Sequence, residues 1–535
     1  MSSPYQAIVI GAGHNGLTCA CYLARAGLKV LVLEQYRTIG GMTITEEETL
    51  PGFRSDLHAS GYQLANLSPV PEELGLLGRY ELIEPDIPFS HAFPDGSIIS
   101  VHRDVEKTVA EIARYSGKDA QTWRALMTRF QEQRHAITSA MFSPPVPFGE
   151  AAGRFAATSA GMDAYRFSLQ SVRSWANQTL DAEATKSLFA SFATFLGASP
   201  DDAGGAELGW LFASVLQNVG NNLVKGGMHR VSLALAEDLR AHGGEIRTNA
   251  RVERIVGDAA RAVAVRMAGG EEIPVGELVV SNVDPGHLAL DLLGSGMVGE
   301  EIVAKMGRYE WGDSIFVILV ALESPIAYKA GPLARQSAHV HLTEPSLDFF
   351  SRVYLQCRGG TLPSAPMIVS WNDSALDPSR APAGKALMKF VVLSVPYAIV
   401  GDGTGRIPGR TWSEAREPYA DYLIDLITEN YIPDLKAKIL KRVAHSPIDI
   451  EARITSAVHG TLGHGAFVPY QHGALRPIPE LGNYRTPVPN VYLCGSGSHP
   501  GPGVSMAPGR NAARVILADL GIDRQKLFAT HQSAP

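Results

Sequence analysis

Three glycines near the start of the chain have the spacing of a loop that holds a phosphate group. Gly11, Gly13 and Gly16 follow a strand-like run and lead into a helix-like run. The first glycine of such a loop permits a tight turn, the second lets the backbone approach a pyrophosphate, and the third lets helix and strand pack closely. The helix N-terminus adds unpaired N–H groups and a partial positive charge. We therefore expect a dinucleotide here; a glycine-rich turn without a ligand is the alternative.

An acidic residue and a glycine doublet follow this loop. Glu34 closes the next strand-like run, where a carboxylate can accept hydrogen bonds from a ribose diol and disfavour a 2′-phosphate. The doublet Gly40-Gly41 comes shortly after. We expect three neighbouring residues to lie against the same ligand: His14, Asn15 and Gln35. No further role is expected for His14.

A second glycine-rich segment lies near the other end of the chain. It follows the strand-like run 490–494 and precedes a helix-like run that starts at Ala507, so it again offers a dipole-binding helix end. A dinucleotide fold built from both ends of a chain is typical of flavin proteins. We therefore expect the two segments to form one FAD site, in which the second contributes Gly495, Ser496, Gly497, Val504 and Ser505.

The absence of two kinds of motif limits the reactions that the chain is expected to catalyse. None of the four cysteines forms a CxxC pair or a metal-ligand spacing, so neither a redox-active disulfide nor a metal site is expected. There is also no second fingerprint for NAD(P)H. Electrons are therefore expected to leave the flavin through oxygen, a quinone or a partner protein, unless the reaction is redox-neutral.

Three residues are candidates for catalysis. His499 lies in the second glycine loop, where an imidazole can orient substrate or move a proton; a histidine bonded to the loop backbone is the alternative. His464 and Tyr470 lie in the glycine-rich segment 458–472, which we expect to be either a loop beside the substrate or a plain surface loop.

Composition limits the partners and the location. The 535 residues carry a net charge of −7 without a basic stripe, which argues against a nucleic-acid partner. No apolar run is long enough to span a membrane, and a strand beginning near residue 5 leaves no room for a presequence. We expect a cytoplasmic protein that contacts a membrane only peripherally, if at all; its oligomeric state stays open.

The middle of the chain alternates between two kinds of pattern. Amphipathic helical runs are expected over 105–115, 120–141 and 151–219, and they are rich in bulky apolar residues. Strand-like runs separated by turns from 314 to 400 predict an antiparallel sheet. Helices are expected again over 414–431 and 435–442. The helical runs favour a cap over an apolar cavity or, equally, a plain helical core.

The motifs together resemble those of the phytoene-desaturase-like FAD oxidoreductases. Segment 225–230 belongs to this resemblance to the family as a whole. Within the family, segments 484–490 and 507–513 are most similar to the branch that holds the carotenoid ketolases and the pyridine nucleotide-disulphide oxidoreductase domain-containing proteins. The resemblance implies an α/β fold. A discontinuous, Rossmann-like FAD-binding domain of the glutathione-reductase type would carry an inserted substrate domain of sheet plus helices.

The resemblance also implies roles for single residues. Arg37, just before the glycine doublet, would line the phosphates and the ribityl chain, and Val252 would contact the adenine through its backbone. Gly497 and the helix after Met506 would approach the flavin ring. The acidic ribityl ligand that many FAD proteins carry after the last strand is missing here, so Ser496 or backbone amides must replace it.

Domain boundaries follow from these assignments. The FAD-binding domain is expected in three segments, 1–70, 221–300 and 476–525. The substrate domain is expected as a helical segment, 71–220, and a part with the antiparallel sheet, 301–475. A flexible tail is expected over 526–535.

Three functions remain open at this point. The first is an FAD-dependent oxidoreductase of the desaturase, dehydrogenase or ketolase kind, which transfers a hydride between a carbon centre of an extended apolar substrate (carotenoid, isoprenoid or lipid-like) and flavin N5. The second is a redox-neutral isomerase that uses reduced FAD to shift a double bond. The third is a flavin-fold interaction protein with little catalysis.

Overall fold

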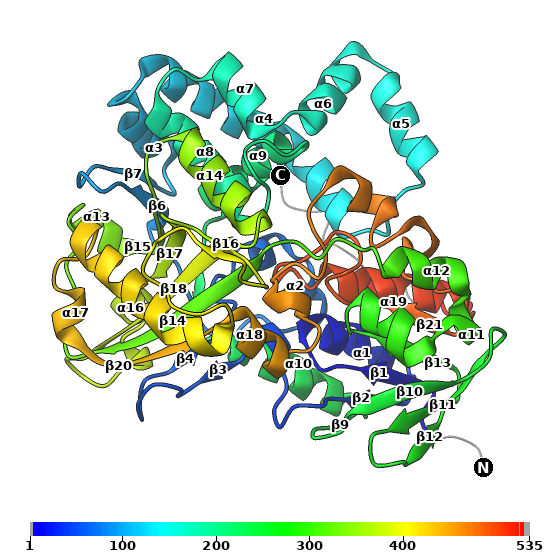
Figure 1. Ribbon diagram of the computed structural model, residues 1–535. Helices are drawn as coiled ribbons and strands as arrows, with labels where there is room; N and C mark the ends of the chain where they lie inside the picture. Colours follow the sequence, from blue (N-terminus) through cyan, green and yellow to red (C-terminus); the bar gives the residue numbers. More distant parts are fainter. Residues whose placement is uncertain (1–3, 524, 529–535) are drawn as a thin grey trace.

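A parallel sheet draws its strands from three distant parts of the chain. The computed structural model describes residues 4–523 and 525–528. Within them the sheet has the order β21-β13-β1-β2-β9 (Figure 1). The bounds are β1 Ala7–Ile10, β2 Val30–Leu33, β9 Glu245–Arg247, β13 Leu278–Ser281 and β21 Val491–Leu493. The mixed α/β fold with a Rossmann-like sheet, expected from the sequence, is confirmed.

Both faces of this sheet are covered, which explains why β1 and β2 read as continuous apolar runs. On one face Ala7 and Val9 share a core with three helices: α1 His14–Arg25, α10 His229–Ala241 and α19 Ala507–Asp519. On the other face Ile8 and Ile10 pack against a small antiparallel sheet: β10 Val252–Gly257, β11 Ala262–Met267 and β12 Glu272–Pro274. The two-residue period of the strand therefore divides its side chains between two cores.

A larger sheet carries the second half of the architecture, in the order β20-β14-β18-β17-β15-β6-β7. Its strands are β6 Ile87–Ala92, β7 Ile98–Val101, β14 Ser314–Leu322, β15 Ser337–Leu342, β17 Met367–Trp371, β18 Ala386–Val395 and β20 Ile439–His445. Neighbours are antiparallel except β6 and β15. Short paired strands complete the set: β3 Thr45–Glu46 with β4 Ser55–Asp56, β5 Leu82–Ile83 with β8 Leu223–Val224, and β16 Thr361–Leu362 with β19 Gly401–Asp402.

Two parts of this sheet differ from the sequence prediction. The prediction of a helix over 435–442 is correct only for its first turn. Helix α17 spans only Leu435–Lys438, and strand β20 follows it. Pairing of β20 with β14 along the sheet edge overrides the helical propensity of its lysine and arginine. The sequence analysis did not predict strands β6 and β7, because the strongest pattern in that region of the sequence is helical.

Helices cover both faces of the larger sheet. Those on one face are α3 Val105–Ala113, α4 Gly117–Met141, α7 Val172–Thr179, α8 Glu183–Phe195, α9 Gly205–Val219 and α14 Leu347–Arg358. The other face packs against α16 Trp412–Asn430 and α17. Smaller helices are α2 Val70–Glu73, α11 Ser295–Val298, α12 Glu300–Met306, α13 Pro332–Gln336, α15 Asp373–Leu376 and α18 Pro447–Arg453. In the described ranges no helix is long and apolar enough to cross a membrane.

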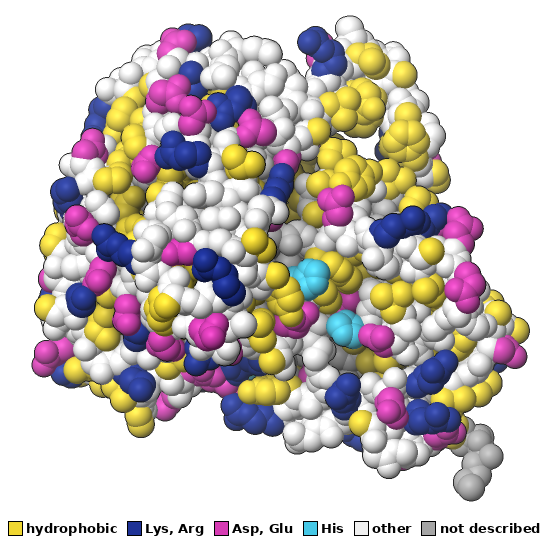
Figure 2. Space-filling view, viewed as in Figure 1, with side chains coloured by type: hydrophobic (Ala, Val, Ile, Leu, Met, Phe, Trp, Pro, Cys, Tyr) yellow, Lys and Arg dark blue, Asp and Glu magenta, His cyan; other side chains and the backbone are white. Residues whose placement is uncertain are grey.

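One pair of helices stands away from both sheets. Helices α5 Phe148–Ala156 and α6 Ser159–Leu169 form a hairpin, and Figure 2 shows hydrophobic side chains gathered over them. Phe148, Met162 and Leu169 are exposed there. The start of the expected tail lies against the core that the parallel sheet shares with α1, α10 and α19, since Phe528 stacks on Tyr22 with ring centroids 4.9 Å apart. Residues 529–535 of that tail lie outside the described residues.

Three histidines of the larger sheet make its stability sensitive to acid. His91, His339 and His341 are buried side by side on β6 and β15. Burial lowers the pKa of His91 and His339 to about 3 and that of His341 well below its ordinary value. Below about pH 6.5 these histidines bind protons in the unfolded chain but stay neutral in the folded chain. The free energy of unfolding is therefore highest above that pH and falls as the pH drops towards 4.

We expect the free energy of unfolding, measured by urea titration, to be lower at pH 5 than at pH 7 by on the order of 1–2 kcal/mol for each of these histidines. His341→Phe should reduce the difference between the two pH values, because it removes one titrating ring and keeps an aromatic side chain. Equal stability at pH 7 and pH 5 would contradict this expectation.

Candidate active site

The glycine loop between β1 and α1 is packed too closely for side chains. A Cβ on Gly16 would lie 2.2 Å from the Gly11 carbonyl oxygen, and one on Gly13 would lie 2.8 Å from Nδ2 of Asn282, just after β13. Gly11 has a φ of +96°, which favours glycine. The doublet joins the same structure, because the Gly40 N–H donates to the Ala12 carbonyl at 2.9 Å.

Glu34 ties the end of β2 to this loop. Its carboxylate accepts hydrogen bonds from the backbone N–H groups of Ala12 and Tyr36, each at 2.8 Å. The side chain is buried, and desolvation raises its pKa above the ordinary value despite these hydrogen bonds. Glu34 thus fixes the path of the glycine loop. Its side chain also lines a cavity that lies along this loop.

A cavity of about 460 Å³ lies along this loop. It collects residues that the sequence analysis selected from four separate stretches: Gly11, Gly13, His14, Asn15, Glu34, Gln35, Gly41, Val252 and Ser496. The loop and the cavity thus bring the two ends of the chain together. Asn15 donates a hydrogen bond from Nδ2 to the Ser496 hydroxyl at 3.2 Å, which joins the first glycine loop to the second.

Two further glycines that the sequence analysis selected, Gly495 and Gly497, and Ser505 pack behind the residues that line the cavity. A Cβ on Gly495 would lie 2.9 Å from the Asn282 carbonyl oxygen, and one on Gly497 would lie 2.5 Å from Pro285 Cδ. The Ser505 hydroxyl accepts from the Ala507 N–H at 3.2 Å, at the start of α19. Close packing explains why small residues occur at these positions.

Arg37 does not line the cavity, although the resemblance gave it a place there. Its side chain is 64% exposed and pairs with Glu46 at 2.7 Å. The arginines on the cavity wall are instead Arg251 and Arg453. Arg453, at the end of α18, pairs with Glu46 and Glu48. Sequence reasoning missed Arg453 because no motif surrounds it; the fold alone carries it to the cavity.

A second cavity, of about 210 Å³, adjoins the first. Aromatic and aliphatic side chains dominate its wall, among them Leu64, Phe195, Phe212, Ile315, Trp311, Trp371, Leu393, Phe467 and Val504. Four residues line both cavities: His14, Met42, His464 and Ser496. The two spaces therefore meet at these four side chains, in the region where α1 begins and the second glycine loop passes.

The three catalytic candidates have different surroundings. His464 lies at the junction of the cavities, and desolvation lowers its pKa to about 4, so its imidazole is neutral at pH 7. His499 lines neither cavity; its Nε2 lies 2.9 Å from the carbonyl oxygen of Ala140, which belongs to α4 and not to the glycine loop of His499. Tyr470 is 57% exposed away from both cavities, and its hydrogen bond to Glu310 raises its pKa to about 12. The geometry thus leaves His464 as the candidate beside a reacting group.

The larger cavity fits an FAD. The cradle around Gly13 has room for a phosphate only because no Cβ is present. Asn15 Oδ1 and His14 Nε2 are buried without a hydrogen-bond partner among the described residues, which leaves polar atoms for a ligand at the same loop. A dinucleotide cavity assembled from both ends of the chain and open to an apolar cavity defines an FAD-dependent oxidoreductase.

Comparison with known proteins agrees with this class. The chain belongs to the flavin-containing amine oxidoreductase family, whose model matches residues 16–517. It is 30% identical to one of the subunits of limonene dehydrogenase from Castellaniella defragrans, over 96% of this chain and 95% of that protein. It is also 30% identical to pyridine nucleotide-disulfide oxidoreductase domain-containing protein 2 of Rattus norvegicus, over 96% and 94%.

More distant similarities cover the whole fold. A lycopene-forming phytoene desaturase of Pseudescherichia vulneris is 25% identical over 96% of this chain and 99% of that protein. The solved cyclohexylamine oxidase of Brevibacterium oxydans superposes with a TM-score of 0.58 at 16% identity, over 97% of this chain and 99% of that one. The predicted resemblance to phytoene-desaturase-like oxidoreductases and the prediction of FAD are confirmed.

Gly13→Ala tests the cradle. Its backbone, at φ −70° and ψ 166°, accepts alanine, and the Asn282 amide can move, so we expect the fold to survive. The added methyl group would obstruct the pyrophosphate, and we expect the affinity of the apoprotein for FAD to fall at least about tenfold, that is by about 1.4 kcal/mol. Quenching of flavin fluorescence during titration measures it.

Gly117→Ala is the matched control. A Cβ on Gly117, at the start of α4, meets nothing within 4 Å, so this variant should bind FAD as the unaltered protein does. Full FAD affinity in Gly13→Ala would contradict the assignment of the cradle.

Proposed function

We propose that this protein oxidises an apolar substrate by transfer of a hydride from a carbon centre to flavin N5, and that oxygen, a quinone or a partner protein then accepts the electrons. One observation carries the proposal: the dinucleotide cavity meets an apolar cavity at His14, Met42, His464 and Ser496. A substrate in the smaller cavity would there lie next to whatever the larger cavity holds.

The side chains of the smaller cavity suit this reaction. FAD, when bound, supplies the hydride acceptor. Trp311, Trp371 and Phe467 would exclude water and orient the substrate, and orientation is most of what a hydride transfer requires. His464, neutral because desolvation lowers its pKa to about 4, would add a polar contact at the junction without placing a charge there.

The cavity volume and the relatives support a hydrocarbon-like substrate. Limonene and phytoene, in the names of two relatives, are both isoprenoid hydrocarbons. The sequence analysis expected an extended molecule, but a cavity of about 210 Å³ favours a compact one. We therefore narrow the proposed substrate class to compact apolar compounds, of which limonene is a convenient probe.

Anaerobic mixing of the FAD-loaded protein with limonene and a panel of compact apolar compounds tests the proposal. We expect at least one compound to bleach the flavin absorbance. A flavin that no compound bleaches would overturn the proposal. Activity only with pre-reduced FAD, without net electron transfer, would instead identify the isomerase alternative.

Leu64→Trp tests the location of the substrate. Leu64 lines the smaller cavity and is only partly buried, so a larger ring can fill the space without disturbing the sheet. We expect FAD binding to persist and the rate of flavin bleaching to fall at least about tenfold. The same change at Leu77, which is exposed, should leave the rate unchanged. Equal rates in the two variants would place the substrate elsewhere.

A further inference from the structure

The smaller cavity limits the size of its ligand. A cavity of about 150 Å³ accommodates a benzene ring. By proportion, 210 Å³ holds about eight non-hydrogen atoms. Because this cavity also meets the larger one, a compact molecule of about eight to eleven non-hydrogen atoms can lie in it. Such a molecule has few groups by which it can be distinguished, so any polar group in the wall matters for its recognition.

One polar residue of the wall has no partner. His58 lines the cavity, between β4 and the short helix Leu64–Leu67, and is only 6% exposed. Neither of its ring nitrogens has a hydrogen-bond partner among the described residues. Leaving such a buried group unpaired costs free energy, which a ligand that pairs with it recovers.

A second polar group lies on the same stretch of wall. Gln63 also lines the cavity, is 9% exposed, and has no partner for its Nε2 among the described residues. Burial, together with the positive charges of Lys389 and Arg453, holds the pKa of His58 well below its ordinary value. The imidazole is therefore neutral and offers one donor and one acceptor.

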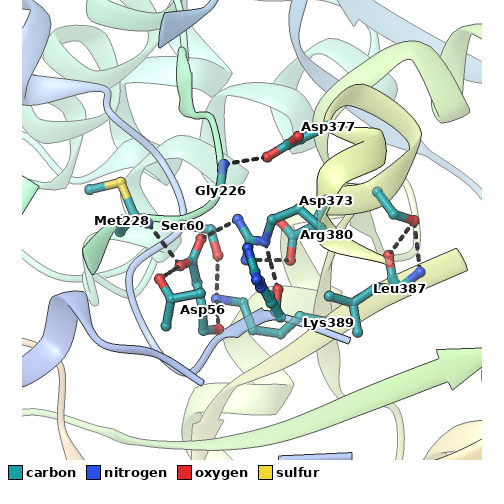
Figure 3. Close-up of polar contacts among 12 residues, drawn as sticks. Asp56, Ser60, Gly226, Met228, Asp373, Asp377, Arg380, Leu387 and Lys389 are labelled. Atoms are coloured by element: carbon teal, nitrogen blue, oxygen red, sulfur yellow. Dashed lines mark hydrogen bonds and ion pairs between the residues drawn. The ribbon is translucent and has the colours of Figure 1, made fainter. Parts of the chain in front are cut away.

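Figure 3 shows a buried network that includes Asp56, Arg380 and Lys389. This network also holds the backbone of His58 in place. Lys389 on β18 is fully buried, and its ammonium group donates to the carbonyl oxygens of His58 at 2.6 Å and Asp56 at 3.1 Å, and to the Ser60 hydroxyl. Arg380 donates to the Asp56 carboxylate at 3.1 Å. Each charge has a partner of opposite sign nearby, so the segment 56–60 is fixed on the wall of the cavity before a ligand arrives.

We propose that His58 is a specificity-determining residue that hydrogen-bonds a hydroxyl group carried by a compact, otherwise apolar ligand. A hydroxyl group both donates and accepts a hydrogen bond, so it matches either tautomer of the neutral ring. Gln63, which lines the same cavity, offers a second donor to such a ligand through its Nε2. This inference rests on the proposed function, because it takes the smaller cavity as the substrate site.

Binding of two saturated probes tests it. p-Menthane and the tertiary alcohol p-menthan-8-ol share one skeleton, and the alcohol carbon bears no hydrogen that could leave as hydride. Binding to the FAD-loaded protein is followed by quenching of tryptophan fluorescence, because Trp311 and Trp371 line the cavity, and by calorimetry. We expect the alcohol to bind at least about tenfold more tightly than the alkane.

Two variants test whether His58 causes the preference for the alcohol. His58→Phe should bring the ratio of the two affinities close to one by weakening the alcohol alone, while FAD binding is retained. His135→Phe, the same change at an exposed position of α4, should keep the preference of the unaltered protein.

A preference that survives in His58→Phe, no preference in the unaltered protein, or failure of both probes to bind would overturn the inference. Since neither probe needs to reduce the flavin, the result is independent of whether limonene bleaches it.

Discussion

The close approach of the first glycine loop to Asn282 is the constraint on which the rest of the site depends. At that point the carboxyl ends of β1 and β13 lie side by side, and a Cβ on Gly13 or Gly16 would lie within 3 Å of Asn282. The second glycine loop packs on the same residue through Gly495. Three segments that are far apart in the sequence can build one dinucleotide cavity because both glycine loops meet Asn282 without a side chain of their own.

The second cavity depends on this arrangement as well. Its junction with the first is formed by His14 at the start of α1, Met42 after the glycine doublet, Ser496 in the second glycine loop, and His464 from the chain between. His14, Met42 and Ser496 belong to the segments that build the dinucleotide cavity, and the backbone of His464 accepts a hydrogen bond from the Tyr309 hydroxyl. The larger sheet contributes the apolar side of the cavity, and Lys389 couples that sheet to the wall segment 56–60. The same packing that forms the cofactor cavity therefore also places the smaller, apolar cavity beside it.

Local motifs predicted the cofactor side of the molecule well. The glycine loop, Glu34 and the second glycine segment carry their chemistry in adjacent residues, so spacing was enough to select eight of the residues that line the larger cavity, drawn from both ends of the chain. The pattern failed where long-range packing decides. Arg37 follows the expected spacing but pairs with Glu46 at the surface, and Arg453 reaches the cavity from α18 without any motif. Likewise β20 is a strand because β14 offers it an edge, and His58 is unpaired because of what surrounds it in space.

We expect FAD to lie along the first glycine loop with its flavin ring at the junction of the two cavities. A crystal structure of the FAD-loaded protein would reveal this arrangement. We predict the pyrophosphate beside Gly13, the ribose near Glu34, and the ring between His464, Met42 and Ser496 with one face towards Trp371 and Phe467. A flavin ring that lies away from His464, or a second cavity separated from it by protein, would contradict the account.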